Sequence, residues 1–239
     1  MEKSKKVKIT LGLFYLIIIS LFLYFLLSKF TFEELTSYEF IKNNRNYFFD
    51  LKQGNFFLLC SIFLIFTIFW VVMAGFGLPI ALLAGFIFGK WFGTLILVIG
   101  LSIGATILYL IGNYFFKEMI KKFFLNKFKN LELKFKKSEF IYLLIYRLVG
   151  GIPFAISNIL PCIFNVKTTN FFWATLFGIT PALFLIVSIG SGLEKIINQN
   201  LVAPKITDLI YSPDIYIPLL GFLILVVTTV VRRKLFYKK

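Results

Sequence analysis

Residues 77–116 read GLPIALLAGFIFGKWFGTLILVIGLSIGATILYLIGNYFF, a short and a long apolar segment separated by Gly89 and Lys90. Proline has no backbone N–H group, so Pro79 favours the first turn of a helix. The segment from Pro79 to Gly89 has about 11 residues, which is roughly 16 Å of helix and half of a bilayer. A half-helix that ends in a lysine-bearing turn predicts a re-entrant hairpin near residues 78–92, followed by a long apolar helix.

Residues 147–166 repeat this pattern, because Gly-Ile-Pro opens another short apolar stretch, which Asn158 and Pro161 interrupt. Interrupted apolar segments at matching positions in two halves of a chain indicate a transport site near the membrane midplane. The sequence therefore predicts a second re-entrant hairpin near residues 147–166 and a weak internal repeat. The residues expected to shape the two hairpins are Pro79, Gly89, Gly150, Gly151, Pro153, Pro161 and Pro181.

The composition of the 239 residues predicts an all-α integral membrane protein. The chain is 59% hydrophobic and 19% aromatic, and its mean hydropathy is +0.88. A soluble domain is about 45–50% apolar, and one globule of this size has no interior large enough to hide the excess. Apolar runs of about 20 residues predict about four to six membrane spans. These features exclude a soluble enzyme, a disordered tail and a soluble nucleic-acid-binding protein.

The positive charge indicates how the chain meets the membrane. Twenty-six Lys and Arg against 11 Asp and Glu give a net charge of +15, gathered in blocks beside apolar spans. Such blocks favour the cytoplasmic side and anionic lipid headgroups, so the expected partners are membrane lipids, not nucleic acid. Residues 1–8, 117–139 and 232–239 are therefore expected inside, which puts both termini in the cytoplasm.

Three regions follow from this pattern. Residues 1–54 contain an uncleaved signal anchor and an interfacial loop, and residues 55–192 form the core with both hairpins. Residues 193–239 supply an external loop, a last span and a basic tail. Full spans are expected at 55–75, 169–190 and 215–231, and a long apolar helix is expected to reach Phe116. If residues 55–75 form a full span, residues 78–116 must begin and end on the same side of the membrane. Inverted repeats would instead prefer hairpins that enter from opposite faces. The sequence leaves this conflict open.

Groups that could perform catalysis are scarce in the apolar core. The chain has no histidine, and no acidic residue lies between Asp50 and Glu118 or between Glu139 and Glu194. Acid–base catalysis and metal binding need such groups, so we expect no enzyme activity, no cofactor and no metal site. Cys60 is expected to be a packed thiol, as is Cys162. Ser157 and Thr175 are expected to form hydrogen bonds within the helix bundle.

Three polar residues are candidates for substrate binding: Arg147, Asn158 and Lys90. An arginine within a span costs about 2.5–3.5 kcal/mol on insertion scales and usually finds a partner. Arg147 could extend its charge to the cytoplasmic interface, or face a cavity and hold lipid phosphate or backbone carbonyls. Asn158 could hold the hairpin through an interhelical hydrogen bond or contact substrate. Lys90 beside Trp91 could be an interfacial anchor or act at a hairpin tip.

Residues 147–181, RLVGGIPFAISNILPCIFNVKTTNFFWATLFGITP, contain an Arg, a Pro-Phe, an Asn and a Gly-x-x-Pro in this order. This stretch resembles the SNARE-associated, VTT-domain branch of the DedA superfamily. Residues 78–114 look like the other half of that family, and the resemblance extends over about residues 55–235. It implies two re-entrant hairpins that meet inside a helical bundle, in proteins similar to lipid scramblases and polyprenyl-phosphate transporters.

The chain departs from the family pattern at three points. Ile80 and Ala81 follow Pro79 where an acidic residue is expected. Pro153 stands in place of a second Arg, and Asn113 stands where many members of the family have an Arg. These losses put proton-coupled transport in doubt. A passive scramblase needs only a hydrophilic groove for headgroups, which Arg147 and the broken helices could supply.

These observations lead to one functional prediction and one alternative. The protein is predicted to move phospholipid or polyprenyl-phosphate headgroups between the leaflets of a bacterial inner membrane. The alternative is a non-transporting membrane scaffold that binds partners or anionic lipid through the basic helix at 117–139. Whether the chain forms a homo-oligomer is left open.

Overall fold

The structure is a computed structural model that describes residues 2–29, 50, 53–75, 77–118, 138–150, 153–198, 216, 220–221, 223–224 and 227–228. Within these residues the chain is helical and has no strand, which confirms the predicted all-α class. The helices are α1 (Glu2–Lys29), α4 (Phe56–Val72), α5 (Gly77–Phe88), α6 (Lys90–Ile111), α8 (Glu139–Val149), α9 (Phe154–Ile159) and α10 (Thr168–Asn198). A π-helical turn (Gly112–Phe116) extends α6, and a 3₁₀ turn (Leu160–Phe164) extends α9.

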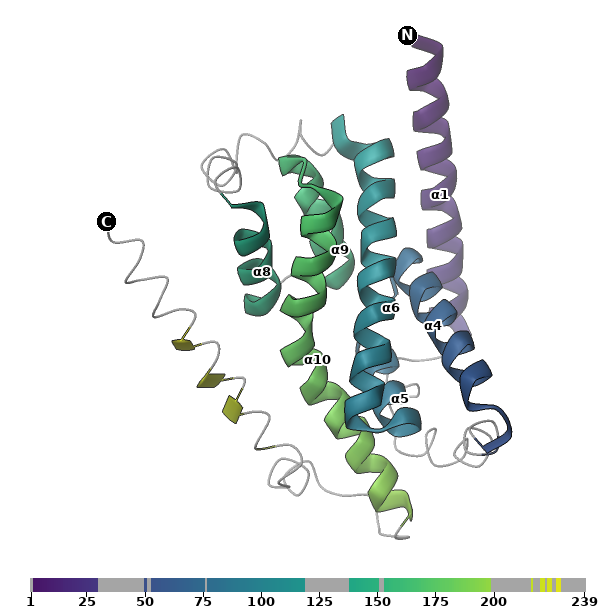
Figure 1. Cartoon of the computed structure of the whole chain (residues 1–239). Coiled ribbons are helices and arrows are strands. Elements are labelled where there is room, and N and C mark those ends of the chain that lie inside the picture. Colours follow the sequence, from purple (N-terminus) through teal and green to yellow (C-terminus); the bar gives the residue numbers. More distant parts are fainter. Residues whose placement is uncertain are drawn as a thin grey trace.

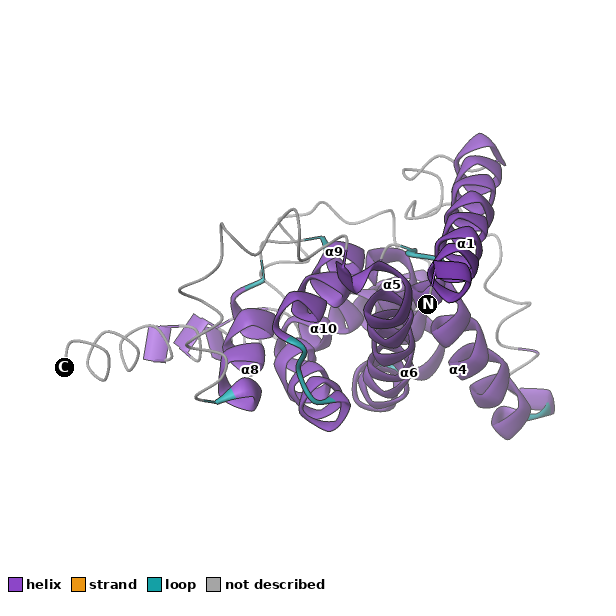
Figure 2. Cartoon of the chain, turned by 90° about the horizontal axis from the view of Figure 1, so that it is seen from above, coloured by secondary structure: helices purple, strands orange, loops and turns teal. Residues whose placement is uncertain are grey.

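Two long helices, α6 and α10, pack against each other along the bundle (Figures 1 and 2). The stretches Lys90–Phe116 and Thr168–Glu194 each have 27 residues and are apolar enough to cross a membrane. A helix of that length is about 40 Å long, which exceeds the roughly 30 Å hydrocarbon core of a bilayer. Helix α6 lies where the sequence predicted a long apolar helix and α10 where it predicted a span, and α10 continues through Pro181 without a break.

The first short-helix pair, α4 and α5, reverses direction after residues 73–75 (Figure 1). Ala74 adopts a left-handed conformation with φ of 58°, and a Cβ on Gly75 would lie 2.3 Å from the Trp70 indole nitrogen. This turn ends α4 after 17 residues, so α4 is shorter than the full span expected over 55–75. Pro79 lies in the first turn of α5, as its missing N–H predicted.

The second short-helix pair, α8 and α9, is separated by Gly150, which has a φ of 64° (Figure 1). Pro153 precedes α9, and the α-helical turns give way to the 3₁₀ turn that contains Pro161. Asn165 then adopts a left-handed conformation with φ of 50°, and α10 begins three residues later. Gly151, expected to shape this hairpin, lies outside the described residues.

The two short-helix pairs approach the bundle from opposite ends. In Figure 1 the α4–α5 pair opens toward the end where α6 begins, and the α8–α9 pair opens toward the end where α10 begins. Helix α4 packs on α6 while α5 also reaches α10, and α8 packs on α10 while α9 reaches α6. The short α4 removes the conflict that a full span over 55–75 created, because residues 56–116 then cross the bundle once.

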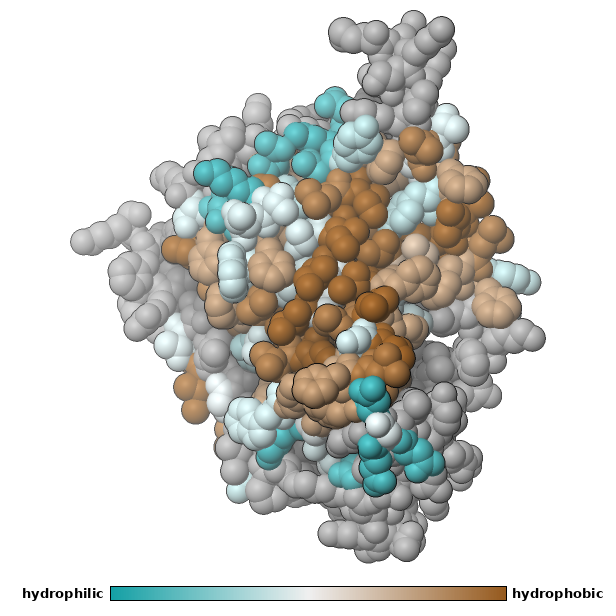
Figure 3. Space-filling view, turned by 45° about the vertical axis from the view of Figure 1, so that its right-hand side comes forward, coloured by the Kyte–Doolittle hydropathy of each residue, from teal (hydrophilic) through white to brown (hydrophobic). Residues whose placement is uncertain are grey.

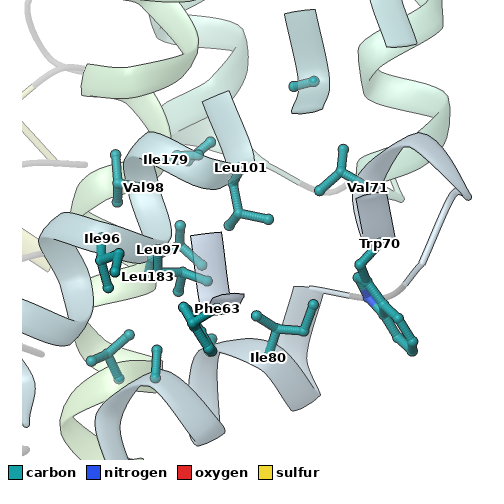
Figure 4. Packing of buried hydrophobic residues seen from close by; sticks show 14 of the residues in the cluster. Phe63, Trp70, Val71, Ile80, Ile96, Leu97, Val98, Leu101, Ile179 and Leu183 are labelled. Carbon is teal, nitrogen blue, oxygen red and sulfur yellow. The ribbon is translucent and has the colours of Figure 1, made fainter. Parts of the chain in front are cut away.

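The backbones of α5 and α10 come into close contact at two glycines. A Cβ on Gly85 would lie 1.9 Å from the carbonyl oxygen of Val187, and a Cβ on Gly190 would lie 2.1 Å from that of Leu82. Small residues permit such close approach between apolar helices. Farther along, Ile179 and Leu183 of α10 belong to the same buried cluster as Leu97 and Leu101 of α6, Phe63 of α4 and Ile80 of α5 (Figure 4).

Helix α1 lies against the turn that joins α4 to α5. The Tyr15 hydroxyl donates a hydrogen bond to the Val72 carbonyl oxygen at the end of α4. The Phe22 ring meets Trp70 edge to face at a centroid distance of 6.1 Å. Near the other end of α1, a Cβ on Gly12 would lie 3.2 Å from the Phe116 ring. These contacts position the N-terminal helix across the first hairpin.

The surface has the distribution of polarity expected of a membrane protein. Figure 3 shows a hydrophobic band between hydrophilic groups at the two ends of the molecule. Exposed side chains within the bundle include Phe57, which is 83% exposed, and Trp91, which is 73% exposed. Such exposure would destabilise a soluble fold and suits contact with lipid. Most of the basic segment 117–139 and of the predicted last span 215–231 lies outside the described residues.

Candidate functional site

Arg147 lies in the last turn of α8, which ends beside it at Gly150. The side chain is only 7% exposed. Its burial follows from the packing of α8 on α10, where a Cβ on Gly178 would lie 2.4 Å from the Arg147 Cβ. The interpretation in which the guanidinium extends to the interface therefore does not describe this structure, because the charge points into the bundle.

Three side-chain oxygens bind the Arg147 guanidinium. Nη1 donates to the Ser157 hydroxyl at 2.6 Å and Nη2 to the Asn158 amide oxygen at 2.6 Å. Nε donates to the Thr175 hydroxyl at 3.2 Å. The guanidinium thus joins α8 to both α9 and α10, and the expectation of bundle hydrogen bonds for Ser157 and Thr175 is confirmed.

Aromatic rings surround the same guanidinium. Its central carbon lies 5.1 Å from the ring centroid of Phe171, 5.6 Å from that of Phe154 and 5.9 Å from that of Tyr146. Phe171 stacks on Tyr109 at 4.5 Å, which connects the cluster to α6. Cation–π contacts of this kind stabilise a desolvated guanidinium without neutralising it.

A cavity with a volume of about 100 Å³ borders the guanidinium. Its lining residues come from α8, α9 and α10, together with the glycine that ends α8: Tyr146, Arg147, Gly150, Phe154, Ser157 and Ile179. Gly150 is itself exposed, so the cavity lies at the surface of the α8–α9 turn. The interrupted helix therefore creates a space beside a buried positive charge.

Unused hydrogen-bond donors remain on Arg147 and on two residues next to it. Arginine has five N–H donors, and the three contacts above use three of them. The Asn158 amide nitrogen is buried without a hydrogen-bond partner, as is the Tyr146 hydroxyl. Because Nη2 can only donate, the Asn158 oxygen must face it, which identifies the nitrogen as the unpartnered atom.

No carboxylate contacts the guanidinium within the described part of the chain. Glu139, at the start of α8, instead accepts hydrogen bonds from the Lys167 backbone at 3.0 Å and the Asn170 amide at 2.8 Å. It ties α8 to the first turn of α10. The described residues also contain no group of three or more His, Cys, Asp or Glu side chains that could hold a metal ion.

Lys90 is not part of the site that contains Arg147 and Asn158. It begins α6, and its carbonyl accepts a hydrogen bond from Thr94 at 2.6 Å. Nearby Gly93 packs against Val187 of α10, whereas Arg147 packs against Gly178, nine residues earlier in that helix. Nine helical residues correspond to about 14 Å. The structure thus brings together two of the three predicted substrate-binding residues and places the third elsewhere.

The sequence did not indicate that aromatic residues and Gly178 surround Arg147. Phe171, Thr175 and Gly178 follow one another at i, i+4 and i+7, which places them on one face of α10. That spacing was visible in the sequence, but nothing indicated that α8 packs on this face. Tyr146 precedes Arg147 directly and gave no signal of its own.

Comparisons with known proteins identify the domain that contains the site. Residues 75–192, about half of the chain, match the VTT domain. The Transmembrane protein 41 homologs of Caenorhabditis elegans and Dictyostelium discoideum are 24% and 26% identical over 61% and 62% of the chain. The uncharacterized protein YqeD of Bacillus subtilis is 28% identical over 61% of the chain and 71% of its own length.

The chain spans 61% of the C. elegans relative and 46% of the Dictyostelium relative that it matches. No solved structure matches the chain. The matched region starts at the turn before α5 and ends within α10, so it contains α6, most of α10 and the Arg147 cluster. The chain therefore belongs to the VTT-domain family of membrane proteins, which is the family that the residues around Pro79 and Arg147 resembled.

Proposed function

We propose that this protein moves phosphate-bearing lipid headgroups, of phospholipid or polyprenyl phosphate, between the leaflets of a membrane. The observation that carries the proposal is a buried Arg147 with no contacting carboxylate in the described residues and a cavity beside it. A buried cation without a counter-charge is costly, and a phosphate supplies both the charge and the acceptors for its N–H groups.

The position of the site supports movement across the membrane. Arg147 lies where α8 ends, and α8 has only 11 residues, or about 16 Å of helix. With the end of α8 at Glu139 near one face of a bilayer, Arg147 lies near its middle. Broken helices at that depth line a substrate path in many transporters, because exposed backbone needs water, protein or ligand around it.

The proposal includes an orientation. Basic residues 1–8 and 117–139 favour the cytoplasm. The end of the bundle that contains Gly12, Phe116 and Glu139 would then be cytoplasmic, and the α8–α9 hairpin would enter from that side. The α4–α5 hairpin would enter from outside. We propose a bacterial plasma membrane as the location, with both termini inside.

A leaflet-exchange assay on purified full-length protein in liposomes tests the function. A fluorescent phospholipid or polyprenyl phosphate is bleached from outside, and the extent of bleaching reports exchange. Exchange above that of empty vesicles is expected, and Arg147→Gln should reduce it at least tenfold, because charge-assisted hydrogen bonds are worth about 1.5–3 kcal/mol. Lys167→Gln removes one exposed positive charge and should leave exchange unchanged.

Exchange at the level of empty vesicles for both lipids would contradict the proposal. The scaffold alternative makes a different prediction, in which neutralising the lysines of 117–139 abolishes function in cells and Arg147→Gln has little effect.

A further inference from the structure

We infer that the Arg147 cavity selects phosphate headgroups that carry no ammonium group, such as phosphatidate or phosphatidylglycerol, over phosphocholine and phosphoethanolamine. This inference rests on the proposed function, because it names the substrate class of the same site. It follows from the hydrogen-bond donors and acceptors around the cavity and from the charge of its lining.

The unpartnered side-chain groups of the residues that line the cavity are mainly donors. They are two N–H groups of Arg147 and the hydroxyl of Tyr146, and the unpartnered amide nitrogen of Asn158 lies next to them but not in the lining. The side-chain oxygens of Ser157, Asn158 and Thr175 each already accept a hydrogen bond from the guanidinium. A phosphate oxygen accepts hydrogen bonds and matches these donors, whereas an ammonium group donates. The Tyr146 hydroxyl can also accept, but it is a single neutral group.

The charge of the lining also favours a phosphate group over an ammonium group. The cavity is lined by one cation, Arg147, and by no acidic side chain. An ammonium group in this space would therefore meet a like charge without a compensating carboxylate. The rings of Tyr146 and Phe154 could otherwise attract a quaternary ammonium, but the guanidinium already lies 5.9 and 5.6 Å from their centroids.

The volume of the cavity admits a phosphate group. A cavity of about 100 Å³ has room for several water molecules, each of which needs about 10–15 Å³ of such volume. A phosphate group has five heavy atoms and fits this space. The donors and the charge of the lining, not its size, therefore distinguish phosphate from ammonium.

Direct binding to purified full-length protein in detergent tests the selectivity apart from transport. Short-chain dihexanoyl phosphatidate and dihexanoyl phosphocholine are titrated by calorimetry. Phosphatidate should bind at least tenfold more tightly, and Arg147→Gln should remove the difference. Tyr146→Phe deletes one unpartnered donor and should weaken phosphatidate binding several-fold without affecting phosphocholine. Tyr24→Phe, at a tyrosine that is 75% exposed in α1, is the matched control and should change neither affinity.

Leaflet exchange of fluorescent phosphatidylglycerol and phosphatidylcholine provides the second readout. Faster exchange of phosphatidylglycerol, by about tenfold, would agree with the inference. Equal affinities together with equal exchange rates would overturn the selectivity and leave the proposed function standing. A tenfold preference in binding with no exchange of any lipid would overturn the proposed function and leave the selectivity standing.

Discussion

A Cβ atom on Gly178 of α10 would lie 2.4 Å from the Cβ of Arg147, so α8 and α10 meet at a position with no room for a side chain. This contact holds the guanidinium within reach of Thr175, one turn away on the same helix. The position of the buried guanidinium is thus determined by Gly178, which makes no hydrogen bond to it.

Gly178→Leu should therefore force α8 away from α10. Overpacking of this kind costs about 1–3 kcal/mol, and the bond from Arg147 to Thr175 should lengthen. We expect a lower thermal unfolding midpoint in detergent and reduced lipid exchange. Gly192→Ala in the same helix is the control, because a Cβ there has nothing within 4 Å. An unfolding midpoint of Gly178→Leu equal to that of the control would show that α8 does not pack on α10 as described.

Asn158→Asp should separate folding from function. The new carboxylate would replace the amide oxygen that lies 2.6 Å from Nη2 of Arg147 and would neutralise the buried cation. A carboxylate–guanidinium pair is about twice as strong as a neutral hydrogen bond, so the unfolding midpoint should be unchanged or higher. Lipid exchange and phosphatidate binding should fall at least tenfold, because the site no longer has a net positive charge. Retained binding would show that phosphate does not contact Arg147.

Gly85→Val tests the backbone contact between α5 and α10. A Cβ here would lie 1.9 Å from the Val187 carbonyl oxygen and 2.9 Å from the Ser191 nitrogen, and backbone atoms cannot rotate away. We expect a larger loss of stability than for Gly178→Leu, or failure to fold, measured by yield and by thermal unfolding. Gly77→Ala, in the same helix with nothing within 4 Å, should be tolerated.

Tyr15→Phe tests whether α1 stabilises the first hairpin. The mutation removes the donor to the Val72 carbonyl, one of the last carbonyls of α4, which have no partner within the helix. A typical hydrogen bond contributes about 0.5–1.5 kcal/mol. Amide hydrogen exchange at residues 73–75 should then be about two- to tenfold faster, while exchange in α8 is unchanged. Equal acceleration in both hairpins would point to global destabilisation instead of a local brace.

Much of the architecture could be predicted from local features of the sequence. Pro79 and Gly89 delimit a short helix because one lacks an N–H group and the other adopts a φ of 77°. The apolar runs predicted both long helices. The end of α4 could not be predicted in this way, because residues 55–75 contain no charged residue and no proline. What stops that helix is a turn in which Ala74 adopts positive φ while Gly75 packs under Trp70.

The sequence alone determined that this is a helical membrane protein with two interrupted segments, and it singled out Arg147 and Asn158. Hydropathy, proline and charge act locally, so they can be read from residues near one another in the chain. Only the tertiary structure decided that the two hairpins approach from opposite ends and that Arg147 turns into the bundle. The tertiary structure also places Lys90 away from the site. These properties depend on which helix faces pack together, and the close contacts at Gly85, Gly178 and Gly190 join residues at least 31 positions apart in sequence.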